Sequence, residues 1–309
     1  MSVAHRMAEG ALSFAHPEVV VRHGEPLASK TSIRVGGAAE IFACPRSVKG
    51  LVALLGWQRR EQLALTILGG GANTLVGDQG VPGLTLKIPA DLFSEDVESA
   101  AAQGRVTLGA GAAIARLVQL MKSHRWVGAE FLAGIPGTIG GALAMNAGTK
   151  MGECLSAIEA VEVATADGIG WLARAELDYG YRHLTLPAHG VVTRARFALP
   201  SGDREASQRA IDADLGYRKK TQPFHQPSFG SVFQNPPGDF AGRLIEGVGL
   251  KGHAIGLAQI SPLHANWIVN LGGARAQDVV ALIELAQQRV REESGIELKP
   301  EVKRVGVFR

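Results

Sequence analysis

Two glycine-rich segments are the strongest sign of chemistry in this chain of 309 residues. The first reads Gly-Gly-Gly-Ala-Asn-Thr over residues 69–74, and the second reads Gly-Ile-Pro-Gly-Thr-Ile-Gly-Gly over residues 134–141. Glycines lack a Cβ, so several backbone N–H groups can converge on an anion, and a helix that begins nearby adds positive potential. Either segment alone is more commonly a tight turn. Both together, with Asn73, Thr74 and Thr138 as further donors, favour a diphosphate ligand.

The common nucleotide, protease and hydrolase motifs do not fit these segments. The sequence contains no GxxxxGK[ST] loop, no H-E-x-x-H pair and no G-x-S-x-G turn. The segment from Gly109 to Ile114 begins like a dinucleotide-binding fingerprint but lacks the third glycine. The two cysteines, Cys44 and Cys154, do not have the spacing of metal ligands, and we expect no metal. The spacing of the glycines alone does not name the diphosphate.

Charge and composition argue against several classes of protein. Lys and Arg number 32 and Asp and Glu number 29, which gives a net charge of +3. This charge is too small to indicate nucleic-acid binding by itself. Two cysteines do not form a disulfide framework in a chain of this length, which favours a reducing, cytoplasmic location. Residues 1–21 contain no uninterrupted apolar stretch, so we expect no signal peptide.

One stretch imitates a membrane span, because residues 131–149 carry no charge over nearly the length of a transmembrane helix. The same stretch contains five glycines, Pro136 and the polar residues Thr138 and Asn146. A lipid-exposed helix has no need of that backbone freedom, whereas a loop wrapped around a ligand does. We therefore expect no membrane insertion.

Strand and helix signals alternate from residue 31 onward and predict a mixed fold of the α+β or α/β class. Residues 1–30 show no sustained period and are interpreted as an N-terminal extension, and residues 200–203 form a candidate boundary. Before the boundary we expect strands at 39–43, 65–68, 83–88, 106–108, 158–164 and 191–197, and helices at 48–60 and 112–123. After it we expect helices at 204–220, 240–246 and 276–294, and strands at 266–269 and, interrupted by Pro300, at 296–302.

Four segments in a fixed order resemble one known family. They are Thr-Ser-Ile-Arg-Val-Gly-Gly at 31–37, the first glycine segment extended to Val76, the second glycine segment preceded by Glu-Phe-Leu-Ala from Glu130, and Asn-Ala-Gly at 146–148. They closely match the UDP-N-acetylenolpyruvoylglucosamine reductases, flavoenzymes that complete UDP-N-acetylmuramate for bacterial peptidoglycan. The resemblance runs from about residue 30 to the C-terminus, and the ordered set of motifs is specific.

The resemblance implies an α+β fold with a two-subdomain, PCMH-type FAD-binding domain over residues 31–201 and a smaller α+β substrate-binding domain over residues 202–309. It implies NADPH-dependent, FAD-mediated reduction of UDP-N-acetylglucosamine enolpyruvate, and we expect a monomer. Residues 69–80 contain no histidine that could attach flavin, so FAD is expected to be non-covalent. The residues implied to contact FAD are Arg34, Gly69, Gly70, Gly71, Ala72, Asn73, Thr74, Gly134, Ile135, Pro136, Gly137, Thr138, Gly140, Gly141 and Asn146.

Three further positions match the family's pattern for the reaction. Reduction of an enolpyruvyl ether needs a hydride at one alkene carbon and a proton at the other, through an enolate-like anion. By resemblance, Ser231 in Gly-Ser-Val-Phe-Gln-Asn-Pro donates the proton. Arg182 in Tyr-Gly-Tyr-Arg polarises the substrate carboxylate, and Glu301 in Pro-Glu-Val stabilises the transition state with Arg182 or helps to move the proton. Without the family, a turn serine, a surface arginine and an edge-strand glutamate are the default interpretations.

The sequence departs from the family's pattern around the substrate. Gln234 stands where the family motif has a lysine, which removes one cation. The segment Ser-Pro-Leu-His-Ala-Asn at 261–266 resembles the family's shorter type, which lacks an extra loop and a tyrosine that close over the nucleotide. The residues implied to bind substrate are Tyr181, Gln234, Asn235 and His264, and the candidates for the substrate diphosphate are Arg218, Lys219, Lys220 and His264.

Two other functions use the same scaffold. Another FAD oxidoreductase acting on a small alcohol or hydroxy acid should lack the Ser231 and Glu301 motifs. A flavin- or nucleotide-binding module without catalysis should have lost Ser231, Arg182 or Glu301. The sequence retains all three residues, which favours the reductase.

Overall fold

The computed structural model describes residues 13–99, 103–149 and 151–308. Its first sheet has four strands in the order β1-β2-β5-β3. These are β1 (Val19–Pro26), β2 (Ala38–Pro45), β3 (Leu65–Ile67) and β5 (Val81–Leu86). Helix α2 (Val48–Arg60) follows β2, and its buried side chains Leu51, Leu54 and Leu55 join the core on one face of this sheet. Ser47 caps the helix by accepting a hydrogen bond from the amide of Gly50 at 2.9 Å.

The first strand corrects one expectation. Residues 1–30 were predicted to be an extension outside the domain, but Val19–Pro26 pair antiparallel with β2 along its whole length. This prediction is wrong for the described part. The sequence did not indicate the strand, because Arg22, His23 and Gly24 break the apolar alternation that a strand usually shows, here at the edge of the sheet. The portion of the predicted extension before residue 13 lies outside the described residues.

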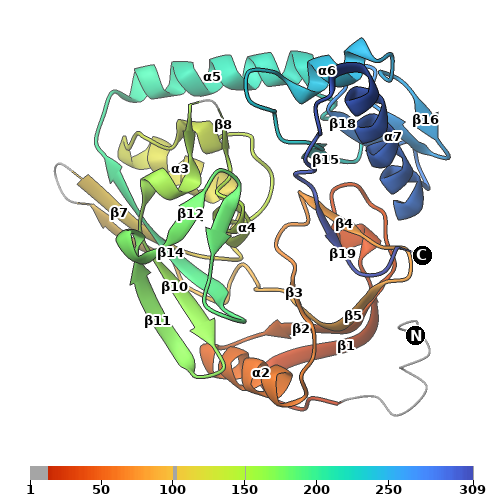
Figure 1. Cartoon of the computed structure of the whole chain (residues 1–309). Coiled ribbons are helices and arrows are strands. Elements are labelled where there is room, and N and C mark those ends of the chain that lie inside the picture. The colour runs from red at the N-terminus through yellow and green to blue at the C-terminus, as the bar shows by residue number, and fades with distance from the viewer. Residues whose placement is uncertain (1–12, 100–102, 150, 309) are drawn as a thin grey trace.

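The second sheet has five antiparallel strands in the order β11-β10-β14-β7-β6 (Figure 1). Its apolar face shares one core with the first sheet, with α3 and α4. Two short hairpins, β8–β9 and β12–β13, lie outside it. The bounds are β6 Asp96–Ser99, β7 Gln103–Gly109, α3 Ile114–His124, α4 Ile139–Ala144, β8 Gly148–Thr149, β9 Gly152–Glu153, β10 Ile158–Thr165, β11 Gly168–Ala173, β12 Asp178–Gly180, β13 His183–Thr185 and β14 Val191–Pro200.

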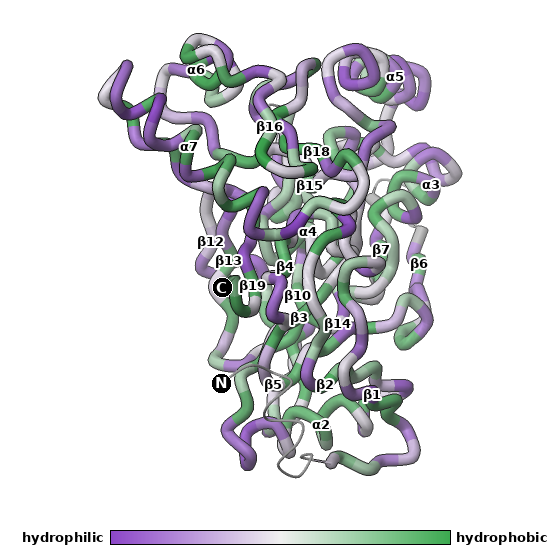
Figure 2. The backbone as a smooth tube through the Cα atoms, turned by 90° about the vertical axis from the view of Figure 1, so that its right-hand side faces the viewer, coloured by the Kyte–Doolittle hydropathy of each residue, from purple (hydrophilic) through white to green (hydrophobic). Residues whose placement is uncertain are grey.

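Helix α5 (Arg204–Thr221) leads from the second sheet to the C-terminal part of the chain, across the top of the molecule in Figure 1. The helix is polar, with Ile211 as its one buried residue, and Figure 2 shows it mostly in the hydrophilic colour. Beyond it, α6 (Ala241–Gly247) and α7 (Ala276–Ser294) pack with a four-stranded sheet in the order β15-β18-β17-β16. These strands are β15 Ser228–Ser231, β16 Ala254–Ile255, β17 Ala258–Ile260 and β18 Trp267–Asn270.

The C-terminal tail returns to the N-terminal half of the molecule. Strand β19 (Lys303–Val305) pairs in parallel with β4 (Thr74–Val76), directly after the first glycine segment. The predicted strand at 296–302 is therefore wrong. In that segment, Pro300 alone forms a β-bridge, to Phe233. The bridge does not extend into a strand, since proline has no N–H with which to continue a ladder.

The two largest apolar clusters change over near residue 201, because the buried residues of the first lie at 19–199 and most of those of the second lie at 229–302. One apolar cluster joins the first two sheets, and a second fills the C-terminal part. This second cluster also contains three residues of the N-terminal part: Ile33 and Val35, which precede β2 in the sequence, and Leu75 of β4. The N-terminal part of the chain thus contributes residues to the C-terminal core, and the boundaries at 31–201 and 202–309 stay a prediction.

The charge-free stretch folds as loop and short helix. It begins within the 3-10 turn Glu130–Leu132 and contains helix α4 and strand β8. Over the residues that the structure describes, no helix has the length and apolar character needed to cross a bilayer.

Gly77→Ala should detach the C-terminal tail. A Cβ at Gly77 would lie 2.2 Å from the carbonyl oxygen of Val307, which is backbone and has little freedom to move. We expect the free energy of unfolding to fall by roughly 1–3 kcal/mol, the usual cost of overpacking, as measured by thermal or denaturant unfolding. The matched control is Gly216→Ala in α5, where a Cβ meets nothing within 4 Å. Equal stability of the two variants would contradict the tail's structural role.

Candidate functional site

An ion pair joins two of the predicted catalytic residues across the molecule. The Nε of Arg182 donates to Oε1 of Glu301 at 2.8 Å, and the two side chains are only 16% and 14% exposed. Arg182 sits in the two-residue turn between β12 and β13, with a left-handed φ of 58°. Such turns commonly need a positive φ. The structure thus places Arg182 against the tail that carries Glu301.

The rest of the Arg182 guanidinium is held by backbone oxygens. One terminal nitrogen donates to the carbonyl of Asn146 at 3.3 Å and the other to the carbonyl of Gly148 at 3.1 Å. The guanidinium carbon also lies 4.9 Å from the centre of the Tyr181 ring. Planar, forked donors of this kind hold a fixed direction, so the guanidinium can present a fixed positive charge to a carboxylate.

Glu301 is anchored by its backbone between the two halves of the molecule. Its amide donates to the carbonyl of Val232 at 2.7 Å, and its own carbonyl accepts from Nδ2 of Asn73 at 3.1 Å. Asn73 in turn accepts from the amide of Lys303 at 3.0 Å. Burial raises the pKa of the Glu301 carboxyl above its ordinary value, and Arg182 opposes this shift. A carboxyl so placed retains a proton more readily than an exposed glutamate.

Ser231 ends strand β15, one residue before the Val232 carbonyl that Glu301 binds. Gly230 precedes it with a φ of 82°, a conformation that favours glycine. The buried side chain of Asn266 holds the next turn in place, because it accepts from the amide of Phe233 at 2.9 Å and donates to the same residue's carbonyl at 2.8 Å. The half-buried hydroxyl of Ser231 makes no hydrogen bond within the described residues, so it is available to a ligand.

The first glycine segment offers free backbone donors. Among the described residues, no hydrogen bond is formed by the amides of residues 69–73. Lys87 lies next to the segment and donates to the carbonyl of Gly69 at 3.2 Å, and burial lowers the pKa of its ammonium group. A run of unpaired amides beside a half-buried cation suits a diphosphate. These residues therefore fit the FAD pyrophosphate that the resemblance assigns to them.

The two glycine segments lie against each other. A Cβ at Gly70 would come within 2.7 Å of the Cα of Gly137, and one at Gly69 within 2.9 Å of Oγ1 of Thr138. Gly137 itself has a φ of 117° and faces Ala72. The structure therefore brings the segments together as predicted, and part of the glycine content serves this contact rather than a ligand.

Other residues of the second segment have structural partners. The amide of Gly140 donates to the carbonyl of Ala110 at 2.9 Å, so it is not free for a cofactor. Thr138 caps α4 by accepting from the amide of Gly141 at 3.4 Å. Gly134, Ile135 and Pro136 form the partly exposed turn before it.

Arg218 on α5 and Arg34 each lie at a contact between the N-terminal and C-terminal parts of the chain. Arg218 donates to the carbonyl of Ala133 at 3.0 Å, next to the second glycine segment, and burial lowers the pKa of its guanidinium. Arg34 is exposed, with a φ of 59°. Asn270 of the C-terminal sheet donates to the carbonyls of Ile33 and Arg34 at 2.9 and 3.4 Å. Both arginines therefore stand where the N-terminal and C-terminal parts meet.

The residues predicted to bind substrate differ in exposure and in the hydrogen bonds that they already make. The carboxamide oxygen of Asn235 accepts from the amide of Ala241, the first residue of α6, at 3.0 Å. Tyr181 is 52% exposed, and the backbone amide of Gln234 donates to Lys299 at 2.9 Å. Burial lowers the pKa of His264, so this residue offers a neutral donor rather than a cation. Lys219 and Lys220 are exposed on α5.

Asn146 departs most from its predicted place. It was expected to contact the cofactor, but its side chain is fully buried and both of its amide hydrogens bind protein, one to Glu153 and one to Gly180. Glu153 and Asn266 were missed as members of the site. Asn266 ends the quoted Ser-Pro-Leu-His-Ala-Asn motif and was within reach of sequence reasoning. Glu153 meets Asn146 only through the β8–β9 hairpin, for which the sequence gives little signal.

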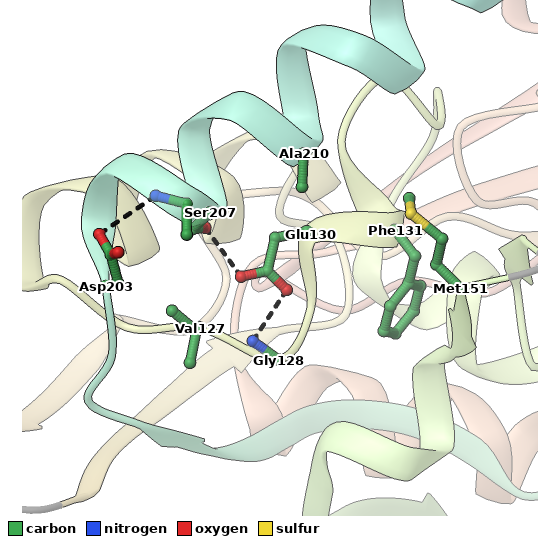
Figure 3. Close-up of a pocket in the computed structure, with 9 residues that line it drawn as sticks. Val127, Gly128, Glu130, Phe131, Met151, Asp203, Ser207 and Ala210 are labelled. Atoms are coloured by element: carbon green, nitrogen blue, oxygen red, sulfur yellow. Dashed lines mark hydrogen bonds between the residues drawn. The ribbon is translucent and has the colours of Figure 1, made fainter.

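A pocket of about 380 Å³ lies away from these residues, between the Glu130–Leu132 turn and the start of α5 (Figure 3). Glu130 points into it and accepts from the hydroxyl of Ser207 at 2.7 Å and from the amide of Gly128 at 2.9 Å. The pocket contains none of the predicted site residues. It lies where the start of α5 packs against the turn that precedes the second glycine segment. Over the part of the chain that the structure describes, no cluster of His, Cys, Asp or Glu could hold a metal ion.

Two family models match this chain. Residues 39–170 match an FAD binding domain, and residues 222–305 match the C-terminal domain of UDP-N-acetylenolpyruvoylglucosamine reductase. The reductase of Myxococcus xanthus is 66% identical over 93% of both chains. That of Anaeromyxobacter strain Fw109-5 is 51% identical over 92% of this chain and 88% of its own.

A solved structure agrees with these matches. The crystal structure of the reductase from Thermus caldophilus superposes with a TM-score of 0.79 at 36% identity, and covers 93% of this chain and 99% of its own. The matches confirm the predicted α+β fold, with an FAD-binding domain followed by a smaller domain, and they confirm FAD as the cofactor. With relatives this similar over nearly its whole length, the chain belongs to the UDP-N-acetylenolpyruvoylglucosamine reductase family.

Proposed function

We propose that this protein reduces UDP-N-acetylglucosamine enolpyruvate to UDP-N-acetylmuramate, a step in the synthesis of peptidoglycan precursors. FAD, when bound, supplies the hydride carrier between NADPH and the enolpyruvyl double bond. The relatives named as this reductase and the FAD-binding domain support the activity. The observation that carries the assignment to this site is the meeting of Arg182, Glu301 and the Ser231 segment beside the first glycine segment.

Arg182 is proposed to bind the carboxylate of the enolpyruvyl group. Hydride addition to the alkene leaves an enolate-like anion conjugated with that carboxylate, and a fixed guanidinium stabilises the developing charge. The guanidinium has five N–H donors, and its contacts with Glu301, Asn146 and Gly148 leave others for the substrate. The ion pair with Glu301 keeps this cation in place before substrate binds.

Ser231 is proposed to donate the proton that completes the reduction. A serine is a weak acid, so it needs a neighbour that favours loss of its proton. Glu301 is bound to the carbonyl of Val232, the residue after Ser231, and its carboxyl has a raised pKa. We propose that Glu301 either stabilises the transition state with Arg182 or returns a proton toward Ser231.

The remaining contacts follow from the same site. FAD is proposed to be held without a covalent bond, with its pyrophosphate on residues 69–74. Tyr181, Gln234, Asn235 and His264 are proposed to face the substrate. Arg218, which lies beside the second glycine segment and also pairs with Asp214, is the proposed cation for the substrate diphosphate. We further propose a cytoplasmic monomer that binds neither nucleic acid nor membranes.

The activity is tested with the purified protein. It should show a flavin spectrum that NADPH bleaches under anaerobic conditions and that the enolpyruvyl nucleotide restores. A small alcohol or hydroxy acid should have no such effect. A colourless protein, or bleached flavin that ignores the enolpyruvyl nucleotide, would refute the proposed function.

Ser231→Ala separates the two half-reactions. We expect NADPH to bleach the flavin within about twofold of the wild-type rate, while restoration by the enolpyruvyl nucleotide slows by at least about 100-fold, the usual contribution of a general acid. Stopped-flow absorbance measures both rates. Ser228→Ala, on the same strand, is the matched control. An equal loss in both half-reactions would mean that Ser231 is structural.

The pH dependence of stability tests the environment of Glu301. Its pKa is raised in the folded state, chiefly by burial, so folding favours the protonated carboxyl. The wild type should therefore lose stability relative to Glu301→Gln as the pH rises from about 4.5, the ordinary glutamate value, through the raised pKa. The measurement is the difference in unfolding temperature across this pH range. A wild type that gains stability relative to the variant would show that Arg182 outweighs burial.

A further inference from the structure

Asn146 makes an unusual set of contacts for a residue beside a flavin site. It is fully buried, with a left-handed φ of 41°. Its Nδ2 donates to Oε2 of Glu153 at 2.7 Å and to the carbonyl of Gly180 at 3.0 Å, and its Oδ1 accepts from the amide of Leu155 at 3.0 Å. One carboxamide thus joins the β8–β9 hairpin and the segment after it to the β12–β13 hairpin.

Arg182 contacts the backbone of the same residue. Its guanidinium donates to the backbone carbonyls of Asn146 and Gly148, while Gly180, two residues earlier, accepts from the Asn146 side chain. Asn146 therefore holds the β12–β13 hairpin at two points. One point lies before the turn that carries Arg182, and the other is Arg182 itself.

The β12–β13 hairpin needs such support. Among the described residues its two strands, Asp178–Gly180 and His183–Thr185, pair only with each other, and most of their residues are exposed. An isolated two-stranded hairpin is marginally stable in water at best. Its direction must therefore be fixed by contacts with the rest of the molecule. Leu184 of β13 packs against the main core, and the hydrogen bonds near Arg182 are those to Asn146, Gly148 and Glu301.

Glu153 strengthens this arrangement. A hydrogen bond to an ionised carboxylate is shorter and stronger than one between neutral groups. The 2.7 Å contact with Glu153 is the shortest that the Asn146 side chain makes. It fixes which end of the carboxamide carries the NH2 group, and that end must face Gly180.

We propose that Asn146, supported by Glu153, is a positioning residue that aims the Arg182 guanidinium at Glu301 and at the substrate carboxylate. This assignment replaces the predicted contact of the Asn146 side chain with the cofactor. It rests on the proposed function, because Arg182 has a carboxylate to bind only if the enolpyruvyl nucleotide is the substrate. Asn146 acts through Arg182 and does not itself touch the substrate.

Asn146→Gly is the direct test, since glycine keeps the left-handed backbone and removes the carboxamide. We expect restoration of bleached flavin by the enolpyruvyl nucleotide to slow by about tenfold or more, and bleaching by NADPH to stay within about twofold. The matched control is Gln62→Gly, which removes a carboxamide from another left-handed residue, at an exposed turn after α2. This control should leave both rates unchanged.

A double-mutant cycle distinguishes positioning from a general loss of structure. Arg182→Lys keeps the charge but loses the fork that binds the carbonyls of Asn146 and Gly148. If Asn146 acts through Arg182, adding Asn146→Gly to Arg182→Lys should slow restoration by less than about twofold more. If the two effects multiply, or if both half-reactions fall together, the proposal is wrong.

Glu153 provides a second route should Asn146→Gly fail to fold. Glu153→Gln keeps an acceptor oxygen for Asn146 and should retain most of the activity. Glu153→Ala removes it and should slow restoration by the nucleotide, again with little further effect in the Arg182→Lys background. Equal behaviour of the Gln and Ala variants would overturn the role of Glu153. Failure of the wild type to respond to the nucleotide would instead refute the proposed function.

Discussion

The pairing of β19 with β4 is the contact on which the site depends. It ties the end of the chain to the strand that follows the first glycine segment, and it continues beyond the strands through Gly77, Gln79 and Gly80. Because Glu301 lies two residues before β19, this pairing holds it between Asn73 on one side and Val232 on the other. The cofactor segment and the substrate-side strand thus share one short backbone connection.

The Arg182–Glu301 pair is the electrostatic counterpart of that connection. The two side chains are mostly buried, and removal of one partner from a buried pair leaves the other charge without compensation, at a cost of several kcal/mol. Arg182 comes from the second sheet's side of the molecule and Glu301 from the tail. The pair therefore forms only when the hairpin and the tail are both in place, and the geometry of one constrains the geometry of the other.

The sequence predicted the long helices well, but it missed two strands, β1 and β19. Helices α2, α5 and α7 were placed within one or two residues, because the apolar periods of α2 and α7 and the boundary residues before the polar helix α5 are local signals. Strand β1 was missed because charged and glycine residues interrupt it at a sheet edge. Strand β19 is three residues long, mostly exposed, and depends on β4 from the other end of the chain. No local pattern predicts such a pairing.

The candidate site shows the same difference between features with a local signal and features that depend on distant residues. The glycine composition of the two segments favoured a diphosphate ligand, and their shared place at FAD, like Arg182, Glu301 and Ser231, came from the resemblance to the family. The structure adds that Gly69 and Gly70 also serve the contact between the two segments. It also shows that the Asn146 side chain binds Glu153 and Gly180, and that its carbonyl accepts from Arg182. Sequence reasoning could not find this, because the partners Glu153 and Gly180 reach Asn146 only through two separate hairpins.

The late position of β19 has a consequence for synthesis of the protein. Translation proceeds at about 5–20 residues per second, so β4 leaves the ribosome roughly 10–45 s before its partner strand does. During that interval the first sheet and its helix can fold, but the edge of β4 stays unpaired and open to contact with other nascent chains. Glu301 and β19 emerge together, long after Arg182 and the first glycine segment. The contact between Arg182 and Glu301 can therefore form only in the last stage of folding.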